Sequence, residues 1–318
     1  MFDRLVLGWE LFKESALIFR RYPVLLVPPA VAYLFQLFVA LVVIAVLHSR
    51  EWTIGEMVLQ LVIFVVLDSF GVVFANSILL ELIQQIETYG RTSLTKALFD
   101  TVGLNMLSFI PLVLVWSLFI LFLMLISAII DAIRGERGRS GLAETFLDMV
   151  DQAVRMLVYL IMPAIAWEDM GFFRAVKRGF HVLKKNKAEF ATGFAITWVF
   201  GLLVGIPVGL VMYIDSQDVE MPVVVWYLTG AYIVACGMYY MYLEQMFVAM
   251  LYLWHLQWEK ATRQARQTGA PLPDLQDVRR PSLMDKYLDL RPARVGRKKV
   301  RKIAAGSDPQ AGGTGTPG

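Results

Sequence analysis

The chain has 318 residues, of which 57% are apolar and only 18% are charged. Its length would allow one large soluble domain, but residues 24–47 and 104–130 contain no charged side chain. Roughly 20 apolar residues cross the hydrocarbon core of a bilayer, so these runs indicate an all-α membrane helix bundle. The single cysteine, Cys236, excludes an internal disulfide and a cysteine-based metal cluster.

Six segments are predicted to cross the membrane as helices. They cover residues 24–47, 57–83, 104–130, 145–167, 190–214 and 223–255. The fourth segment is the least apolar, because its strictly apolar part, residues 156–167, is too short to cross alone. Extending it back to Thr145 draws in Asp151 and Arg155 but avoids an odd number of spans. The sixth is about 50 Å long as a helix, so it should tilt or extend past the membrane.

Three amphipathic segments are predicted to lie on the membrane surface, at residues 2–22, 92–102 and 171–187. In the third, apolar residues recur at intervals of three and four: Phe173, Val176, Phe180 and Leu183. Basic residues fill the rest of that helix, which suits the surface of an anionic membrane. The predicted headgroup contacts are Arg174, Lys177, Arg178, Lys184 and Lys185, with Arg297, Lys298 and Lys299 of the tail.

The surface segments precede the first, third and fifth spans, which suggests three copies of a unit of one surface helix and two spans. Most of the 30 lysines and arginines fall on the side of the two termini. The positive-inside rule therefore predicts both termini in the cytoplasm and a place in the cell's cytoplasmic membrane. Residues 257–318 form a basic cytoplasmic tail, and its Gly- and Pro-rich end predicts partial disorder.

Small residues recur on one face of the fifth predicted span. Gly193, Gly201, Gly205 and Gly209 are spaced in multiples of four, so a neighbouring helix backbone can approach this face closely. The favoured interpretation is packing against another helix of the same chain. The alternative is contact between two copies of the protein.

Four polar residues are candidates for an intramembrane site: Asp68, Asn76, Arg155 and Glu244. An unpaired charge at the centre of a span costs several kcal/mol, so Asp68 is predicted to pair with Arg155 at similar depth. This pair, with Asn76, is either a polar clamp between helices or a proton- or ion-coupling site. Glu244 is either an intramembrane acid or a carboxylate at headgroup depth, and headgroup depth is the favoured interpretation.

No enzymatic signature is apparent. The three histidines, His48, His181 and His255, fall on a loop, a surface helix and the end of a span, so their spacing predicts no metal site and no catalytic triad. No Gly-rich phosphate loop occurs either. The sequence therefore predicts no catalytic residue, metal or cofactor. The basic run of the tail has no interleaved aromatic residues, which favours anionic lipid and not nucleic acid as its partner.

Residues 163–187 resemble a group of uncharacterised prokaryotic multi-span membrane proteins, including membrane domains found beside glycerophosphodiester phosphodiesterases. The resemblance is carried by an acidic residue at a span end and a following helix: Glu168, Gly171, Phe172, Ala175, Val176, Lys177 and Arg178. It implies a six-span helical layout and assigns no catalytic residues.

Two functional hypotheses follow from the sequence. The first is a non-enzymatic six-span protein that engages lipids, a membrane-protein partner or a second copy of itself. The second is a transporter or channel for a small solute or ion that uses Asp68.

Overall fold

The computed structural model describes residues 2–48, 52–134, 141–217, 221–275 and 278. Throughout this part the chain is helical and contains no strand. The helices are α1 (Phe2–Arg21), η1 (Pro23–Leu26), α2 (Val27–His48), α3 (Ile54–Tyr89), α4 (Leu94–Asp100), η2 (Thr101–Asn105), α5 (Met106–Arg134), α6 (Gly141–Glu168), α7 (Phe172–Lys185), α8 (Lys187–Asp215) and α9 (Val223–Thr268). The all-α prediction is therefore confirmed.

Five of these helices are long and apolar enough to cross a membrane: Pro23–His48, Ile54–Tyr89, Met106–Ile130, Met149–Glu168 and Val223–Thr268. Their surfaces are unlike those of a soluble protein. None of the residues in the most apolar 18-residue window of Val223–Thr268 is buried, and on α2 Phe38 and Leu41 are both exposed. Such large apolar surfaces are stable in contact with lipid. The chain is thus built as a multi-pass membrane protein.

The predicted span at residues 190–214 lies within α8, a continuous helix. Of the described part of α8, Val199–Asp215 is an apolar helix shorter than the five spans. The structure therefore gives five candidate spans, and the sixth span and the threefold repeat stay predictions.

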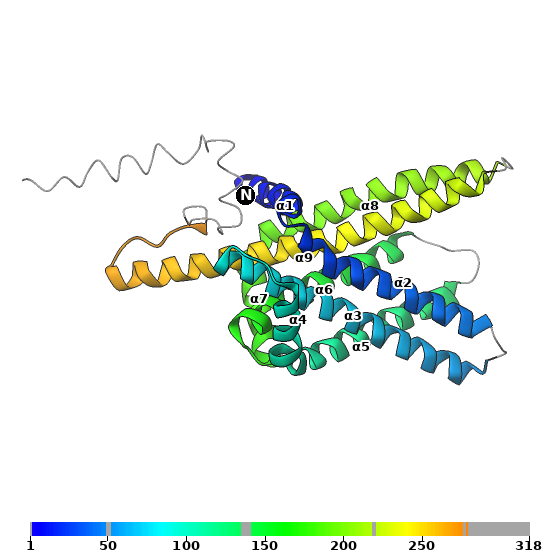
Figure 1. Ribbon diagram of the computed structural model, residues 1–318, viewed down its shortest axis with the longest axis horizontal. Coiled ribbons are helices and arrows are strands. Elements are labelled where there is room, and N and C mark those ends of the chain that lie inside the picture. Colours follow the sequence, from blue (N-terminus) through cyan, green and yellow to red (C-terminus); the bar gives the residue numbers. More distant parts are fainter. Residues whose placement is uncertain (1, 49–51, 135–140, 218–220, 276–277, 279–318) are drawn as a thin grey trace, which may run out of the picture.

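The three predicted surface segments lie at one end of the bundle as α1, α4 and α7 (Figure 1). We call this the basal end and the opposite end the distal end. Toward the distal end, α8 and α9 lie together, away from the ends of α2 and α3 (Figure 1). The last turns of α9 extend beyond the bundle at the basal end, drawn in orange (Figure 1). The tail residues Arg297, Lys298 and Lys299 lie outside the described residues.

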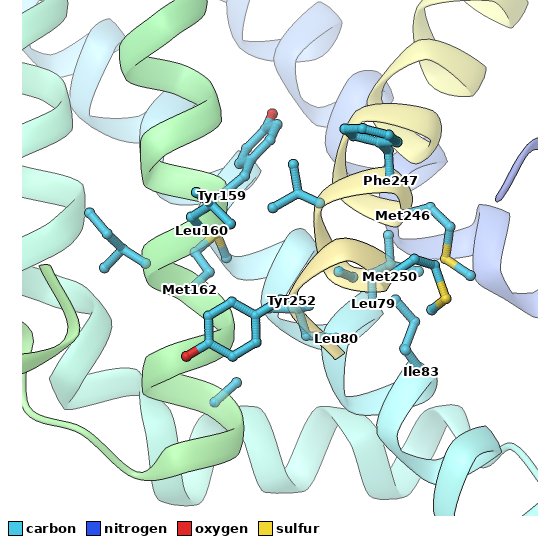
Figure 2. Close-up of a cluster of buried hydrophobic side chains, with 14 of the residues drawn as sticks. Leu79, Leu80, Ile83, Tyr159, Leu160, Met162, Met246, Phe247, Met250 and Tyr252 are labelled. Atoms are coloured by element: carbon cyan, nitrogen blue, oxygen red, sulfur yellow. The ribbon is translucent and has the colours of Figure 1, made fainter. Parts of the chain in front are cut away.

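The packed core lies between α3, α6 and α9. Figure 2 shows Leu79 and Ile83 of α3 facing Met246 and Met250 of α9, with Leu160 of α6 beside them. All five side chains are buried. This core occupies the basal half of the three helices, so that half is a rigid support for polar groups in its walls.

Local signals explain where α3 begins and ends. Thr53 and Glu56 form a reciprocal capping box, in which each side chain accepts a hydrogen bond from the other residue's backbone N–H. At the other end, Gly90 adopts φ 66° and its N–H donates to the carbonyl of Ile86. A glycine with positive φ therefore ends α3.

Candidate functional site

A polar cluster, buried at Gln152 and Glu244 and partly exposed elsewhere, joins α6 to α9. Gln152 donates from Nε2 to Oε1 of Glu244 at 2.7 Å, and the Tyr240 hydroxyl donates to the same oxygen. Arg155 lies with Nη1 3.8 Å from Oε2 of Glu244, and its Nη2 is 2.6 Å from Oδ2 of Asp151. We call these five residues the intramembrane cluster. On α6, Arg155 follows Asp151 by four residues and Gln152 by three, and on α9 Glu244 follows Tyr240 by four, so each helix presents its polar groups on one side.

Glu244 is the innermost charged group of this cluster. Its side chain is only 5% exposed and is enclosed by α6, so it does not extend from the edge of the bundle as a solvated carboxylate would. Burial within the bundle does not fix the depth of Glu244 in the membrane, so its placement at headgroup depth stays a prediction. A buried carboxylate costs stability unless it is paired; Gln152 and Tyr240 both donate to Oε1, and Arg155 lies 3.8 Å from Oε2.

The predicted pair between Asp68 and Arg155 is not formed. Asp68 is partly buried on α3, where it interacts with the side chain of Gln36 on α2 and feels the charge of Arg155 over a longer distance. Arg155 turns instead toward Asp151, one helical turn earlier, and toward Glu244. Residues four apart on one helix are neighbours, so Asp151 is within reach of Arg155 without any contact between helices.

Asn76 lies on the wall of α3 next to this cluster. Its side chain is 0% exposed, and its amide lies near the hydroxyl of Tyr159, which also senses the charges of Arg155 and Glu244. Among the described residues, neither amide atom of Asn76 has a hydrogen-bond partner. Of the other three predicted intramembrane residues, Glu244 thus contacts Arg155, Asp68 interacts with its charge, and Asn76 lies beside Tyr159.

Sequence reasoning did not name three members of the cluster as site residues: Asp151, Gln152 and Tyr240. All three carried a signal, because Asp151 and Gln152 lie four and three residues before Arg155, and Tyr240 lies four residues before Glu244. Polar residues at helical spacing beside a charge in an apolar segment indicate a shared face.

A second polar group, at the basal end, ties α7 to α6 and α9. Arg178 donates from Nη1 and Nη2 to the two carboxylate oxygens of Glu259, each at 2.7 Å, and from Nε to Glu168 at 2.9 Å. Glu168 also accepts a hydrogen bond from the hydroxyl of Tyr252. We call these four residues the basal clasp. The side chain of Arg178 is only 13% exposed, so its prediction as a lipid-headgroup contact is wrong.

His181, His255 and Glu259 bring potential metal-ligand atoms within 4.8 Å of one another. Their surroundings do not suit a metal ion. The Nδ2 of Asn186 donates to the carbonyl of Val182 and lies 3.1 Å from Nδ1 of His255. Because an amide nitrogen only donates, Nδ1 accepts and the imidazole proton lies on Nε2, 3.3 Å from Glu259. If Nε2 bound a metal ion, the imidazole proton would move to Nδ1, which faces the Nδ2 donor of Asn186.

The outward face of α7 combines aromatic and basic side chains. Phe173 is 85% exposed and Phe180 is 52% exposed, and both point away from the bundle. Four basic side chains of α7 are exposed with them: Arg174, Lys177, Lys184 and Lys185. We call these six residues the α7 outer face. The inner face is small and buried: Ala175, Gly179 and Val182. The helix thus packs on the protein with one side and leaves the other to the surroundings.

The glycines of α8 do not contact another described helix. A Cβ atom added at Gly201, Gly205 or Gly209 would have no neighbouring atom within 4 Å. The expectation that these three pack against a helix of the same chain is therefore wrong. The surroundings of Gly193 lie outside the described part of the chain.

No family model matches the chain, and neither a curated protein nor a solved structure matches it. The resemblance at residues 163–187 stays a prediction.

Proposed function

We propose that the protein is a non-enzymatic, six-span protein of the cytoplasmic membrane that binds anionic phospholipid through its basal surface helices. The α7 outer face carries this proposal. Phe173 and Phe180 are seven residues apart, so their rings share one side of the helix, and Lys177 and Lys184 follow each ring by four residues. Phenyl rings that enter the acyl boundary beside ammonium groups at headgroup level are typical of interfacial helices.

The basal clasp supports this proposal, because it fixes the angle at which α7 meets the membrane. Arg178 and Glu259 hold α7 to α9, and Gly179 allows α7 to approach Ile161 of α6 closely. A side chain at Gly179 would place its Cβ 2.9 Å from Ile161 Cγ1. Helix α7 is therefore held rigidly, and its phenyl rings and basic groups face the membrane without a further change in the position of the helix.

The orientation follows from charge. The described basic residues of the basal end include Arg20, Arg21, Arg91, Lys96, Lys187, Lys260, Arg263 and Arg266 besides those of α7. Under the positive-inside rule the basal end faces the cytoplasm, where anionic headgroups attract each basic residue by about 1 kcal/mol. The 29 residues of α8 make a helix about 43 Å long, enough for a sixth span. An even number of spans leaves both termini on the cytoplasmic side.

Native mass spectrometry of the full-length protein can test the lipid preference. Protein from nanodiscs of equal phosphatidylcholine and phosphatidylglycerol should retain phosphatidylglycerol preferentially. A variant with Arg174, Lys177, Lys184 and Lys185 all changed to Gln should lose this preference roughly tenfold or more. The control variant has Lys in place of Arg and Arg in place of Lys at the same four positions. It keeps the positive charges and should keep the preference for phosphatidylglycerol. An unchanged lipid ratio in the Gln variant would contradict the proposal.

A second candidate function is transport of a small solute or ion. It is favoured by the intramembrane cluster, because ionisable residues inside membrane bundles mark pathways for substrates or ions. The test is flux into proteoliposomes, which Asp68→Asn should abolish if Asp68 couples transport. Flux that is absent in the wild-type protein, or equal in the variant, would exclude this use of Asp68.

A further inference from the structure

The charges around Arg155 do not balance. Three carboxylates act with this single guanidinium: Asp151 and Glu244 at short range, and Asp68 from α3. If all three were ionised, the group would carry two uncompensated negative charges within helices that cross the bilayer. Each uncompensated charge in that environment costs several kcal/mol. Positive charge from outside the chain would remove this cost.

The geometry indicates which carboxylate receives that charge. Asp151 has the close contact with Arg155 at 2.6 Å, whereas Glu244 is 3.8 Å from it. Oxygen Oε1 of Glu244 accepts hydrogen bonds from Gln152 and Tyr240. Oxygen Oε2 is buried and has no hydrogen-bond partner among the described residues. A buried carboxylate oxygen in this state is a strong acceptor for a proton or a cation.

Helix α3, which packs on α6, carries buried polar side chains. Asn76 and Ser69 are both 0% exposed, and the side-chain polar atoms of both have no hydrogen-bond partner in the described part of the chain. They are seven residues apart, so they share one face of α3. Tyr159 connects Asn76 to the cluster, because its hydroxyl lies near the Asn76 amide and senses Glu244. Hydroxyl, amide and carboxylate oxygens are ligands for hard cations.

We propose that the intramembrane cluster takes up one monovalent cation, a proton or a sodium ion, at Oε2 of Glu244. The uptake neutralises one of the excess negative charges. It is independent of lipid binding at α7 and does not itself require transport.

Among the elements packed on α9, α6 supplies the charged side chains near this oxygen. From α6 the charged or titratable groups are Asp151, Arg155 and Tyr159, and from α9 itself Tyr240. Helix α8 contributes the ring of Phe200, which stacks on Tyr240 at 5.2 Å. Helix α1 offers backbone carbonyls, those of Ser15 and Ala16, to Tyr242 and Tyr239, and Arg20 of α1 acts on Tyr239. Helix α2 lies against Gly237 with Tyr33, and its Gln36 faces Asp68.

Two measurements on the full-length protein in detergent distinguish the cations. The first is the melting temperature in sodium chloride against choline chloride at equal ionic strength and pH. If sodium is the cation, it should raise the melting temperature by several degrees, and Glu244→Gln should abolish the rise. The second is the infrared band of a protonated carboxyl group in choline buffer. If a proton is the cation, the band should be present in the wild type and lost in Glu244→Gln.

The control is Asp215→Asn, which removes an exposed carboxylate at the end of α8 and should change neither measurement. Tyr240→Phe preserves the side-chain shape and removes one donor to Oε1 of Glu244. If Glu244→Gln does not fold, Tyr240→Phe should instead shift the band or raise the sodium concentration needed for stabilisation. The absence of both wild-type signals, or their persistence unchanged in the Glu244 and Tyr240 variants, would overturn the proposal.

Discussion

Arg178 of α7 and Glu259 of α9, 81 residues apart in sequence, meet with two parallel hydrogen bonds of 2.7 Å. This bidentate contact raises the pKa of the Arg178 guanidinium; burial opposes the rise, and the hydrogen bond to Glu168 adds to it. The guanidinium therefore stays charged over the whole pH range in which the protein is folded. It provides the counter-charge for two carboxylates at once.

Arg178→Ala should lower the free energy of unfolding by about 3 kcal/mol, because it leaves Glu168 and Glu259 without their shared cation. Thermal unfolding in detergent, followed by circular dichroism, measures this loss. Arg174→Ala, on the exposed side of the same helix, is the control and should change the free energy by less than about 0.5 kcal/mol. Equal effects of the two substitutions would show that the clasp does not stabilise the fold.

Gly179→Leu should destabilise the protein by about 1 to 3 kcal/mol. The new side chain would begin 2.9 Å from Ile161 Cγ1 and 3.4 Å from the Ile161 backbone nitrogen, so α7 would have to move from α6. The same thermal measurement applies. A melting temperature equal to that of the wild type would mean that α7 is not packed this closely.

Gly205→Leu should be neutral or stabilising by up to about 1 kcal/mol, because glycine disfavours a helix and this position has open space around it. The substitution is the same as at Gly179, so the comparison isolates the surroundings of the two glycines. A loss of stability together with a smaller particle in size-exclusion chromatography would instead reveal contact between copies at this face.

Cysteine labelling can test the orientation. In a Cys236→Ser background, Ser216→Cys lies at the distal end of α8 and Gln267→Cys near the basal end of α9. A membrane-impermeant maleimide should label Ser216→Cys on intact cells, and Gln267→Cys only after permeabilisation. The reverse pattern would place the basal end outside the cell and contradict the proposed orientation.

Much of the helical layout could be predicted, because a long run without charged residues is stable in a bilayer as a helix that crosses it. The run at residues 24–47 corresponds to η1 and α2, and the run at residues 104–130 lies within η2 and α5. The end of α9 at Thr268 could not be predicted, because beyond residue 255 the helix is polar and no apolar pattern marks it. Its continuation depends on contacts with α7, such as that between Lys185 and Trp258.

The candidate site was predictable by residue type but not by pairing. A charge inside an apolar segment identified Asp68, Arg155 and Glu244. Their partners depend on how α3, α6 and α9 cross, which hydrophobic periodicity does not encode. In the same way, the periodicity of α7 could not separate Arg178, which turns inward, from Lys177, which stays exposed. The distinction rests on Glu259, a residue far along the chain.

Helix α9 runs through 46 residues from Val223 to Thr268 and contains no proline. An unbroken α-helix of this length is about 70 Å long and resists bending. A force or torque applied where it emerges at the basal end is therefore conveyed along the same rod past Glu244 to its far tip. A partner that binds the protruding end of α9 would therefore transmit its movement to the interior of the bundle.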